Sequence, residues 1–169
     1  MHLLARHVTD VPDFPKPGIL FRDITPLLRS HFSETVAALE GLWSEAEWAA
    51  TDAVAGVESR GFILAAALAE RRGKGFVPIR KKGKLPPPVV DREYDLEYGS
   101  GVLEMQRGSG QLLVVDDVLA TGGTLAASAA LAVDAGFRVD RVGVLIDLGI
   151  AGSFRWRGET ARSVIHYGG

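Results

Sequence analysis

The sequence predicts an α/β fold, with a mostly parallel, twisted central sheet and helices on both faces. Short apolar runs that are typical of buried strands alternate along the chain with longer runs, rich in alanine and leucine, that are typical of helices. Two of these strand–helix units are joined by turns that carry glycine beside charged or hydroxyl side chains. Because ligands of such sheets bind at the carboxyl ends of the strands, we expect the functional residues in these turns.

The N-terminal part is expected to hold two helices separated by a loop and a strand. Residues 1–11 predict a short helix. Two prolines and a glycine within residues 13–18 predict an extended loop instead of regular structure. A short strand is expected within residues 19–26. Residues 33–48 have helical periodicity, with Ser33 as the expected N-cap.

A strand–turn–helix–strand unit follows. The apolar run at residues 52–57 predicts a buried strand, and residues 62–72 predict a helix. Arg60 lies in the turn between them, and residues 75–79 are the next predicted strand. Strands joined through a helix are normally parallel. This unit therefore puts an arginine at the carboxyl end of a strand.

Residues 80–100 differ from the rest of the chain. They contain the densest basic run, three consecutive prolines and little helical or strand periodicity. A segment of this length without regular structure predicts either a disordered insertion or a functional lid. The basic run is alternatively a solvated surface patch, but it directly follows a strand end, where it would neutralise a diphosphate and close over it. A strand is expected at residues 102–106, with Gly99 and Gly101 as hinge candidates.

The stretch at residues 111–124 is the most informative part of the sequence. It opens with an apolar run that predicts a buried strand, at whose end we expect Asp116 and Asp117. Residues 120–124, Ala-Thr-Gly-Gly-Thr, then lead into a predicted helix over residues 125–135. Two further strands are expected near the C-terminus, at residues 139–148 and 163–166.

A glycine turn at a helix N-terminus is well suited to an anion. Free backbone N–H groups and the positive end of the helix dipole face the ligand, and glycine lets the backbone approach it closely. Carboxylates do not bind a bare phosphate, so the ligand should also carry hydroxyls or a divalent cation. Taken singly, threonine is a common N-cap and paired acids are usually solvated surface. Their order along the chain predicts a sugar phosphate site with magnesium.

Composition excludes several other classes of protein. Hydrophobic residues make up 47% and charged residues 24% of the 169 residues, as in a soluble enzyme of one domain. The net charge of −2 argues against a nucleic-acid partner. The sequence has no cysteine, and its apolar runs are far shorter than the ~20 residues that a membrane helix needs. A cytoplasmic protein with no membrane partner is therefore expected. The glycine motifs of P-loop and Rossmann nucleotide sites are missing from the sequence.

Four segments resemble those of one enzyme family. Residues 114–124, VVDDVLATGGT, resemble the phosphoribosyl-pyrophosphate motif of type I phosphoribosyltransferases. Residues 14–25 resemble the N-terminal hood of adenine phosphoribosyltransferases, and residues 56–62 resemble their pyrophosphate loop. Residues 77–85, together with residues 94–99, resemble their flexible catalytic loop.

The resemblance implies a type I phosphoribosyltransferase-like architecture. A single domain would span residues 1–169, with a small hood mainly at residues 1–30 and a flexible catalytic loop at about residues 80–101. The matching segments run from about residue 13 to residue 124, and beyond residue 135 the match is loose. Such enzymes couple adenine to the ribose of phosphoribosyl pyrophosphate, release pyrophosphate, use Mg²⁺ and form homodimers.

The resemblance also implies a role for each matching residue. The 5′-phosphate would bind Ala120, Thr121, Gly122, Gly123 and Thr124. Asp116 and Asp117 would hold the ribose hydroxyls and, through substrate or water, the metal. Pyrophosphate would bind Ser59, Arg60, Arg80, Lys81 and Lys84, with Lys82 as the alternative to Lys81. A non-proline cis peptide is expected at Glu58–Ser59. Phe21 and Val118 would sandwich adenine, the backbone of Leu20 and Arg22 would recognise its edge, Glu97 would be the catalytic acid or base, and Tyr98 would share the closing loop.

Two alternatives stay open. A related transferase would use hypoxanthine, guanine or xanthine, because base specificity depends on a few contacts. A regulator would bind phosphoribosyl pyrophosphate without catalysis and control nucleic acid. The slightly negative net charge and the presence of Glu97 and Tyr98 argue against the regulator.

Overall fold

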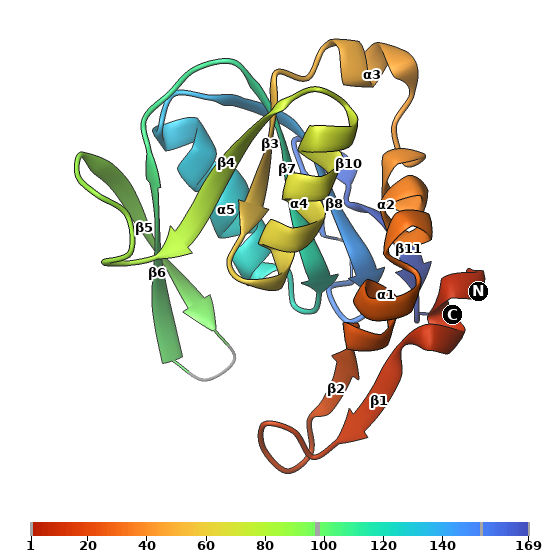
Figure 1. Cartoon of the computed structure of the whole chain (residues 1–169). Helices are drawn as coiled ribbons and strands as arrows, with labels where there is room; N and C mark the ends of the chain where they lie inside the picture. The colour runs from red at the N-terminus through yellow and green to blue at the C-terminus, as the bar shows by residue number, and fades with distance from the viewer. Residues whose placement is uncertain (1, 97–98, 153, 169) are drawn as a thin grey trace.

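The computed structural model describes residues 2–96, 99–152 and 154–168. Its centre is a seven-stranded sheet in the order β11-β8-β7-β3-β4-β6-β5 (Figure 1). These strands are β3 (Ala53–Val57), β4 (Gly75–Lys81), β5 (Val89–Leu96), β6 (Gly99–Gln106), β7 (Gln111–Leu119), β8 (Arg138–Asp147) and β11 (Arg162–His166). Neighbours from β11 to β4 are parallel, whereas β6 pairs antiparallel with β4 and β5. The predicted mostly parallel α/β sheet is confirmed.

Helices cover both faces of the sheet. They are α1 (Thr25–Ser30), α2 (Phe32–Glu40), α3 (Glu45–Ala49), α4 (Arg60–Arg71) and α5 (Gly123–Asp134). Figure 1 shows α4 in front of the sheet and α5 behind it. Each face has its own apolar core, with Leu64 and Leu68 of α4 in one and Leu125 and Leu131 of α5 in the other. The two predicted strand–helix units therefore send their helices to opposite faces. None of the described helices is long and apolar enough to cross a membrane.

Residues 2–30, which we call the hood, lie at one end of the sheet and contain a two-stranded ribbon and a short helix (Figure 1). The short helix expected over residues 1–11 is confirmed only in part, because a 3₁₀ helix covers Leu3–His7 and the chain then continues as β1 (Thr9–Pro12). The expected strand within residues 19–26 is confirmed as β2 (Leu20–Asp23), which pairs antiparallel with β1. Pro26 does not end the strand, which stops at Asp23, but lies in the first turn of α1, which begins at Thr25.

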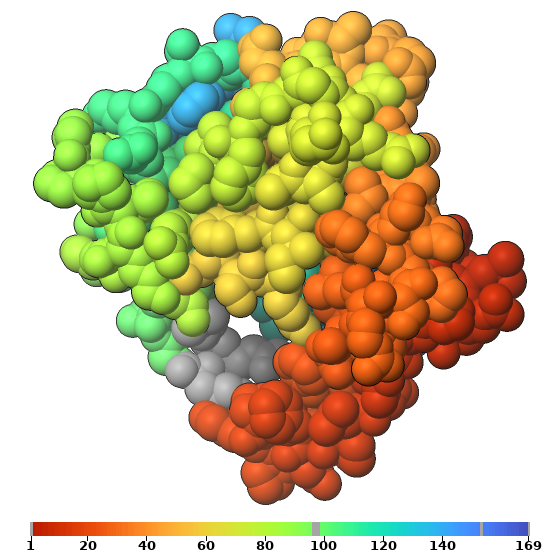
Figure 2. All heavy atoms as spheres, in the orientation of Figure 1, coloured from red at the N-terminus to blue at the C-terminus, as the bar shows by residue number. Residues whose placement is uncertain are grey.

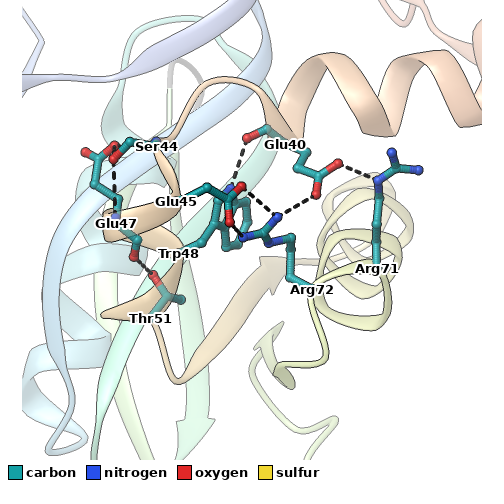
Figure 3. Close-up of polar contacts among 8 residues, drawn as sticks. All are labelled: Glu40, Ser44, Glu45, Glu47, Trp48, Thr51, Arg71 and Arg72. Carbon is teal, nitrogen blue, oxygen red and sulfur yellow. Dashed lines mark hydrogen bonds and ion pairs between the residues drawn. The ribbon is translucent and has the colours of Figure 1, made fainter.

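The single helix expected over residues 33–48 is wrong. The chain forms α2 and α3 with a turn between them, and Ser33 lies inside α2. Ser44 is the N-cap of α3, and its Oγ accepts the backbone N–H of Glu47 at 3.3 Å (Figure 3). The Glu47 carboxylate in turn accepts the Ser44 backbone N–H at 2.8 Å. This capping box satisfies two N–H groups and lets a new helix start in the middle of the expected one.

The prediction that residues 80–100 lack regular secondary structure is also wrong. Strand β4 continues to Lys81, residues 89–96 form β5, and Gly99 begins β6. Strands β5 and β6 make an antiparallel hairpin at the edge of the sheet, in which Asp91 lies opposite Glu104. That this hairpin moves during catalysis stays a prediction. A further two-stranded ribbon, β9 (Arg155–Trp156) with β10 (Glu159–Thr160), lies outside the main sheet.

Candidate active site

The site lies at the carboxyl edge of the sheet, between β3 and β7. The chain leaves β3 through α4 toward β4 on one side, and leaves β7 through α5 toward β8 on the other. Connections that diverge in this way open a crevice between the two strands. The pairing of β3 with β7 ends at Gly56 and Val115, but β7 continues beside β8 to Leu119. The last residues of β7 therefore border this crevice.

Asp116 and Asp117 lie inside β7, not after its end as the sequence predicted. They are only 7% and 8% exposed. Asp116 Oδ1 accepts the backbone N–H of Asp117 at 2.9 Å. Burial, and then the charge of Asp117, raises the pKa of Asp116 well above its usual value. Two buried adjacent carboxylates of this kind favour hydroxyl donors or a cation as ligands.

Arg60 joins three parts of the site. Its Nη2 lies 2.7 Å from Asp117 Oδ2, and its Nη1 donates to the backbone carbonyl of Arg22 in the hood at 3.4 Å. Its guanidinium carbon lies 4.8 Å from the centre of the Phe21 ring. The arginine predicted in the turn after β3 is in fact the first residue of α4, and it reaches both the hood and the carboxylate pair.

Gly61 sets how closely α4 approaches β7. A Cβ at this position would lie 2.7 Å from Asp116 Oδ1 and 3.3 Å from the Val115 carbonyl oxygen. Such distances are shorter than van der Waals contact, so any side chain here would push the helix away from the carboxylates. Glycine after Arg60 therefore keeps the arginine and the aspartates in one crevice.

The predicted phosphate loop is formed as expected at the N-terminus of α5. Gly122 precedes the helix with φ of 91°, and a Cβ there would lie 2.6 Å from the Phe154 ring, so both conformation and space require glycine. No side chain caps the helix among the described residues, which leaves its first N–H groups facing the loop. A cavity of about 80 Å³ lies in this loop and is lined by Asp116, Val118, Leu119, Ala120, Thr121, Gly122, Thr124 and Leu125. The loop therefore offers an anion the positive end of α5.

A second cavity, of about 400 Å³, lies between the hood and the sheet edge. It is lined by Gly18, Ile19, Leu20, Arg22, Ala120, Leu148 and Ile150. Figure 2 shows the hood, in red and orange, and the green β5–β6 hairpin as separate parts of the surface, and none of these lining residues belongs to the described part of the hairpin. The Arg22 side chain pairs with Asp10 and lies over the Tyr167 ring, so it is engaged by the hood and the C-terminal segment. A mostly apolar, half-open cavity of this size suits a planar base.

Phe21 and Val118 border the crevice at different points. Phe21 packs edge-on against Phe14 at 5.1 Å and faces Arg60. Val118 lines the smaller cavity, beside the phosphate loop. Their roles on the two sides of a base stay a prediction.

Basic residues at the end of β4 and in the turn that follows it surround one carboxylate, that of Glu58. Lys84 Nζ lies 3.1 Å and Arg80 Nη2 lies 3.6 Å from Glu58 Oε2. Glu58 also accepts the backbone N–H of Lys81. Lys82 instead pairs with Asp91 on β5, at 3.1 Å. The structure thus brings Arg80, Lys81 and Lys84 together at the end of β3 and turns the Lys82 side chain toward the hairpin.

Three remaining predictions concern the pyrophosphate loop and the catalytic loop. The peptide bond between Glu58 and Ser59 is cis, as expected. Ser59 is the N-cap residue of α4, directly beside Arg60. Glu97 and Tyr98 lie outside the described residues.

The sequence did not point to Glu58, Leu148 or Ile150 as site residues. Glu58 could be predicted only as a member of the pyrophosphate loop. Its partners Arg80 and Lys84 lie at the end of β4 and in the turn that follows it, and the sequence alone does not show that the ends of β3 and β4 meet. Leu148 and Ile150 follow β8, and their only signal was that an apolar strand ends nearby.

Comparison with known proteins identifies the family. The phosphoribosyl transferase domain matches residues 36–150. An adenine phosphoribosyltransferase from Hydrogenovibrio crunogenus is 51% identical over 98% of this chain and 97% of its own length. This chain belongs to the adenine phosphoribosyltransferase family. The crystal structure of the family member from Rhodothermus marinus has a TM-score of 0.86 at 40% identity and covers 96% of both chains. The Saccharomyces cerevisiae enzyme, complexed with adenine and an imino-altritol bisphosphate, has a TM-score of 0.83 at 32% identity, covering 95% of this chain and 94% of its own.

Proposed function

We propose that this chain joins adenine to the ribose of phosphoribosyl pyrophosphate, producing AMP and pyrophosphate for purine salvage. One observation carries the proposal beyond family membership: Ala120 lines both the phosphate-loop cavity and the hood cavity. The 5′-phosphate and the base of a nucleotide are attached to the same ribose, so their sites must adjoin. The ribose would lie between the two cavities, beside the buried carboxylates.

The proposed reaction breaks the bond between C1′ and the pyrophosphate oxygen and forms a bond between C1′ and N9 of adenine. Positive charge develops on the sugar and negative charge on the leaving pyrophosphate. Arg60, Arg80 and Lys84 would stabilise that negative charge through charge-assisted hydrogen bonds. Asp116 and Asp117 would accept hydrogen bonds from the ribose hydroxyls and so fix C1′ relative to the base.

Each substrate part has a proposed set of contacts. The first N–H groups of α5 and the hydroxyls of Thr121 and Thr124 would hold the 5′-phosphate. Adenine would enter the hood cavity against Leu20, with its edge toward the backbone of residues 20–22. As N9 bonds to the sugar its proton must leave, and Glu97 is our candidate for accepting it.

Magnesium fits the same carboxylates. Asp117 Oδ2 is buried and pairs with the Arg60 guanidinium at 2.7 Å without hydrogen-bond geometry, so it can still accept from a metal-bound water or a ribose hydroxyl. Within the described part of the chain no group of three potential metal-binding side chains occurs, so the substrate would supply most of the oxygen ligands. When bound, the ion would neutralise charge on the leaving pyrophosphate.

The test is product formation from phosphoribosyl pyrophosphate and Mg²⁺ with adenine, hypoxanthine, guanine and xanthine in separate reactions. We expect AMP from adenine and no product from the other bases. Turnover of an oxopurine would retain the phosphate site but refute the proposed role of residues 20–22. Binding of phosphoribosyl pyrophosphate without turnover of any base would favour the regulator.

Two further proposals rest on the family alone. We expect a homodimer, which light scattering coupled to size-exclusion chromatography would detect as twice the 18.1 kDa chain mass. We also expect the enzyme in the cytoplasm, which fractionation of its host cell would test.

A further inference from the structure

The carboxylate of Glu104 is buried in the middle of β6, outside the residues assigned above. Glu104 is 3% exposed, and its strand neighbours Leu103 and Met105 are 1% and 0% exposed. Successive strand residues face opposite sides of a sheet, so Glu104 faces the side opposite to Leu103 and Met105. Because Glu104 is buried as well, another segment must cover that side. That segment is the turn that follows β4.

Three backbone N–H groups of this turn donate to Glu104. Gly83 donates to Oε2 at 3.0 Å, while Lys84 and Leu85 donate to Oε1 at 2.7 and 2.6 Å. These hydrogen bonds, the one from Gly83 first, lower the pKa of Glu104 despite its burial. The carboxylate therefore remains charged at neutral pH and fixes three consecutive residues of the turn.

The same turn carries the cations assigned to pyrophosphate. Lys84 Nζ lies 3.1 Å from Glu58 Oε2, and Arg80 Nη1 donates to the Lys84 carbonyl oxygen at 3.4 Å. A carboxylate that holds the backbone of Lys84 thus also sets the position of its ammonium group and of the neighbouring guanidinium.

We propose that Glu104 is a positioning residue that holds the turn at Gly83–Leu85 so that Lys84 and Arg80 face the pyrophosphate of the substrate. This inference rests on the proposed pyrophosphate site. Its consequence is that the basic part of the predicted lid is a fixed wall of the site, anchored to β6.

The experiment compares Glu104→Gln with the unaltered enzyme in steady-state kinetics for each substrate. Glutamine keeps one acceptor oxygen but turns an NH₂ group toward a backbone donor, so the turn should shift. A shift of about 1 Å at a positioned group can cost a hundredfold in rate. We expect kcat/KM for phosphoribosyl pyrophosphate to fall by about tenfold to a hundredfold, while KM for adenine stays within about twofold.

The matched control is Asp91→Asn. Asp91 lies opposite Glu104 in the hairpin and pairs with Lys82, but its carboxylate is half exposed. This variant should leave both substrate constants unchanged. Equal losses in Asp91→Asn and Glu104→Gln would assign the effect to the hairpin as a whole and overturn the inference.

A combined variant separates positioning from simple loss of structure. If Glu104 acts through Lys84 and Arg80, then adding Glu104→Gln to an enzyme that carries both Lys84→Ala and Arg80→Ala should lower kcat/KM no further than those two substitutions alone, within about twofold. Independent losses that multiply would overturn the proposal. So would a Glu104→Gln variant that loses adenine and phosphoribosyl pyrophosphate affinity equally.

Failure of the inference differs from failure of the proposed site. A Lys84→Ala enzyme with unchanged kinetics would refute the pyrophosphate site itself. A defective Lys84→Ala enzyme beside an unaffected Glu104→Gln enzyme would refute only the role of Glu104. Should Glu104→Gln not fold, hydrogen exchange of the unaltered protein decides: slow exchange of the Gly83, Lys84 and Leu85 amides is expected, and fast exchange would overturn the proposal.

Discussion

Glu47 is the side chain whose replacement should most clearly separate the stability of this enzyme from its activity. Its carboxylate joins α3 to β11, with Arg162 Nη2 at 2.7 Å from Oε1 and Nη1 at 3.1 Å from Oε2. It also accepts the backbone N–H of Ser44 and so begins α3 (Figure 3). None of these contacts involves the crevice between β3 and β7. The Glu47→Gln variant should therefore lose stability and keep its catalytic constants.

The size of the loss follows from the pKa of Glu47. The Arg162 hydrogen bonds, and then the Ser44 N–H, lower this pKa from 4.5 to about 2. At ~1.4 kcal/mol per pKa unit the full shift corresponds to at most about 3–4 kcal/mol. The side chain is 24% exposed, so solvent screens the pair, and glutamine keeps one acceptor. We expect a loss of about 1 kcal/mol, which lowers Tm by roughly 2–4 °C for a chain of this size.

The assay is thermal unfolding of both proteins by circular dichroism between pH 7 and pH 3. A carboxylate with a lowered folded-state pKa stabilises the protein fully above its unfolded pKa, 4.5, and loses that contribution as pH falls toward about 2. The difference in Tm should therefore be constant near pH 7 and shrink below pH 4.5. Glu45→Gln is the control, because Glu45 pairs with Arg72 while 84% exposed and should cost less. A difference in Tm that is independent of pH, or an equal loss in the control, would refute this reasoning.

Three substitutions test the site itself. Asp117→Ala should lower kcat by at least about a hundredfold with little change in Tm, because its carboxylate pairs with Arg60 at the site and belongs to neither apolar core; a loss of stability comparable to a core deletion would contradict its place in the site. Gly61→Ala should lower activity although alanine favours helix, since its Cβ would meet Asp116; unchanged kinetics would mean that α4 moves away freely. Leu148→Ala should raise KM for adenine and leave KM for phosphoribosyl pyrophosphate unchanged, because Leu148 lines the hood cavity and not the cavity in the loop before α5; the reverse pattern would show that the base binds elsewhere.

The sequence predicted what is local in the chain. The strands at residues 52–57, 75–79, 102–106, 139–148 and 163–166 and the helices at residues 62–72 and 125–135 are confirmed within a few residues, because buried strands and amphipathic helices have distinct apolar patterns. The glycine turn before α5 was predictable for the same reason, since its glycines and hydroxyls are contiguous, while its binding of phosphate stays a prediction.

The predictions that failed concern features that depend on residues distant in the sequence. Strand β5 carries Asp91, Arg92 and Glu93 because it is an edge strand that faces solvent, so it lacks the apolar run of a buried strand. The break between α2 and α3 comes from a capping box whose acid also binds Arg162, more than a hundred residues later. The partners of Glu58 likewise depend on which strand ends meet.

The ion pairs of Glu58 and Asp117 imply that the site contains its own counter-ions. At the proposed pyrophosphate site, phosphoribosyl pyrophosphate would compete with the Glu58 carboxylate for Lys84 and Arg80, so its affinity would be the difference between two sets of ion pairs. An anion of low charge would form weaker ion pairs with these cations than the Glu58 pairs that it must break. Only a highly charged anion would therefore bind. We therefore expect inorganic phosphate to compete with phosphoribosyl pyrophosphate much more weakly than pyrophosphate does, and equal inhibition constants would contradict this. Chloride and other abundant monovalent anions would be rejected in the same way, without any steric barrier.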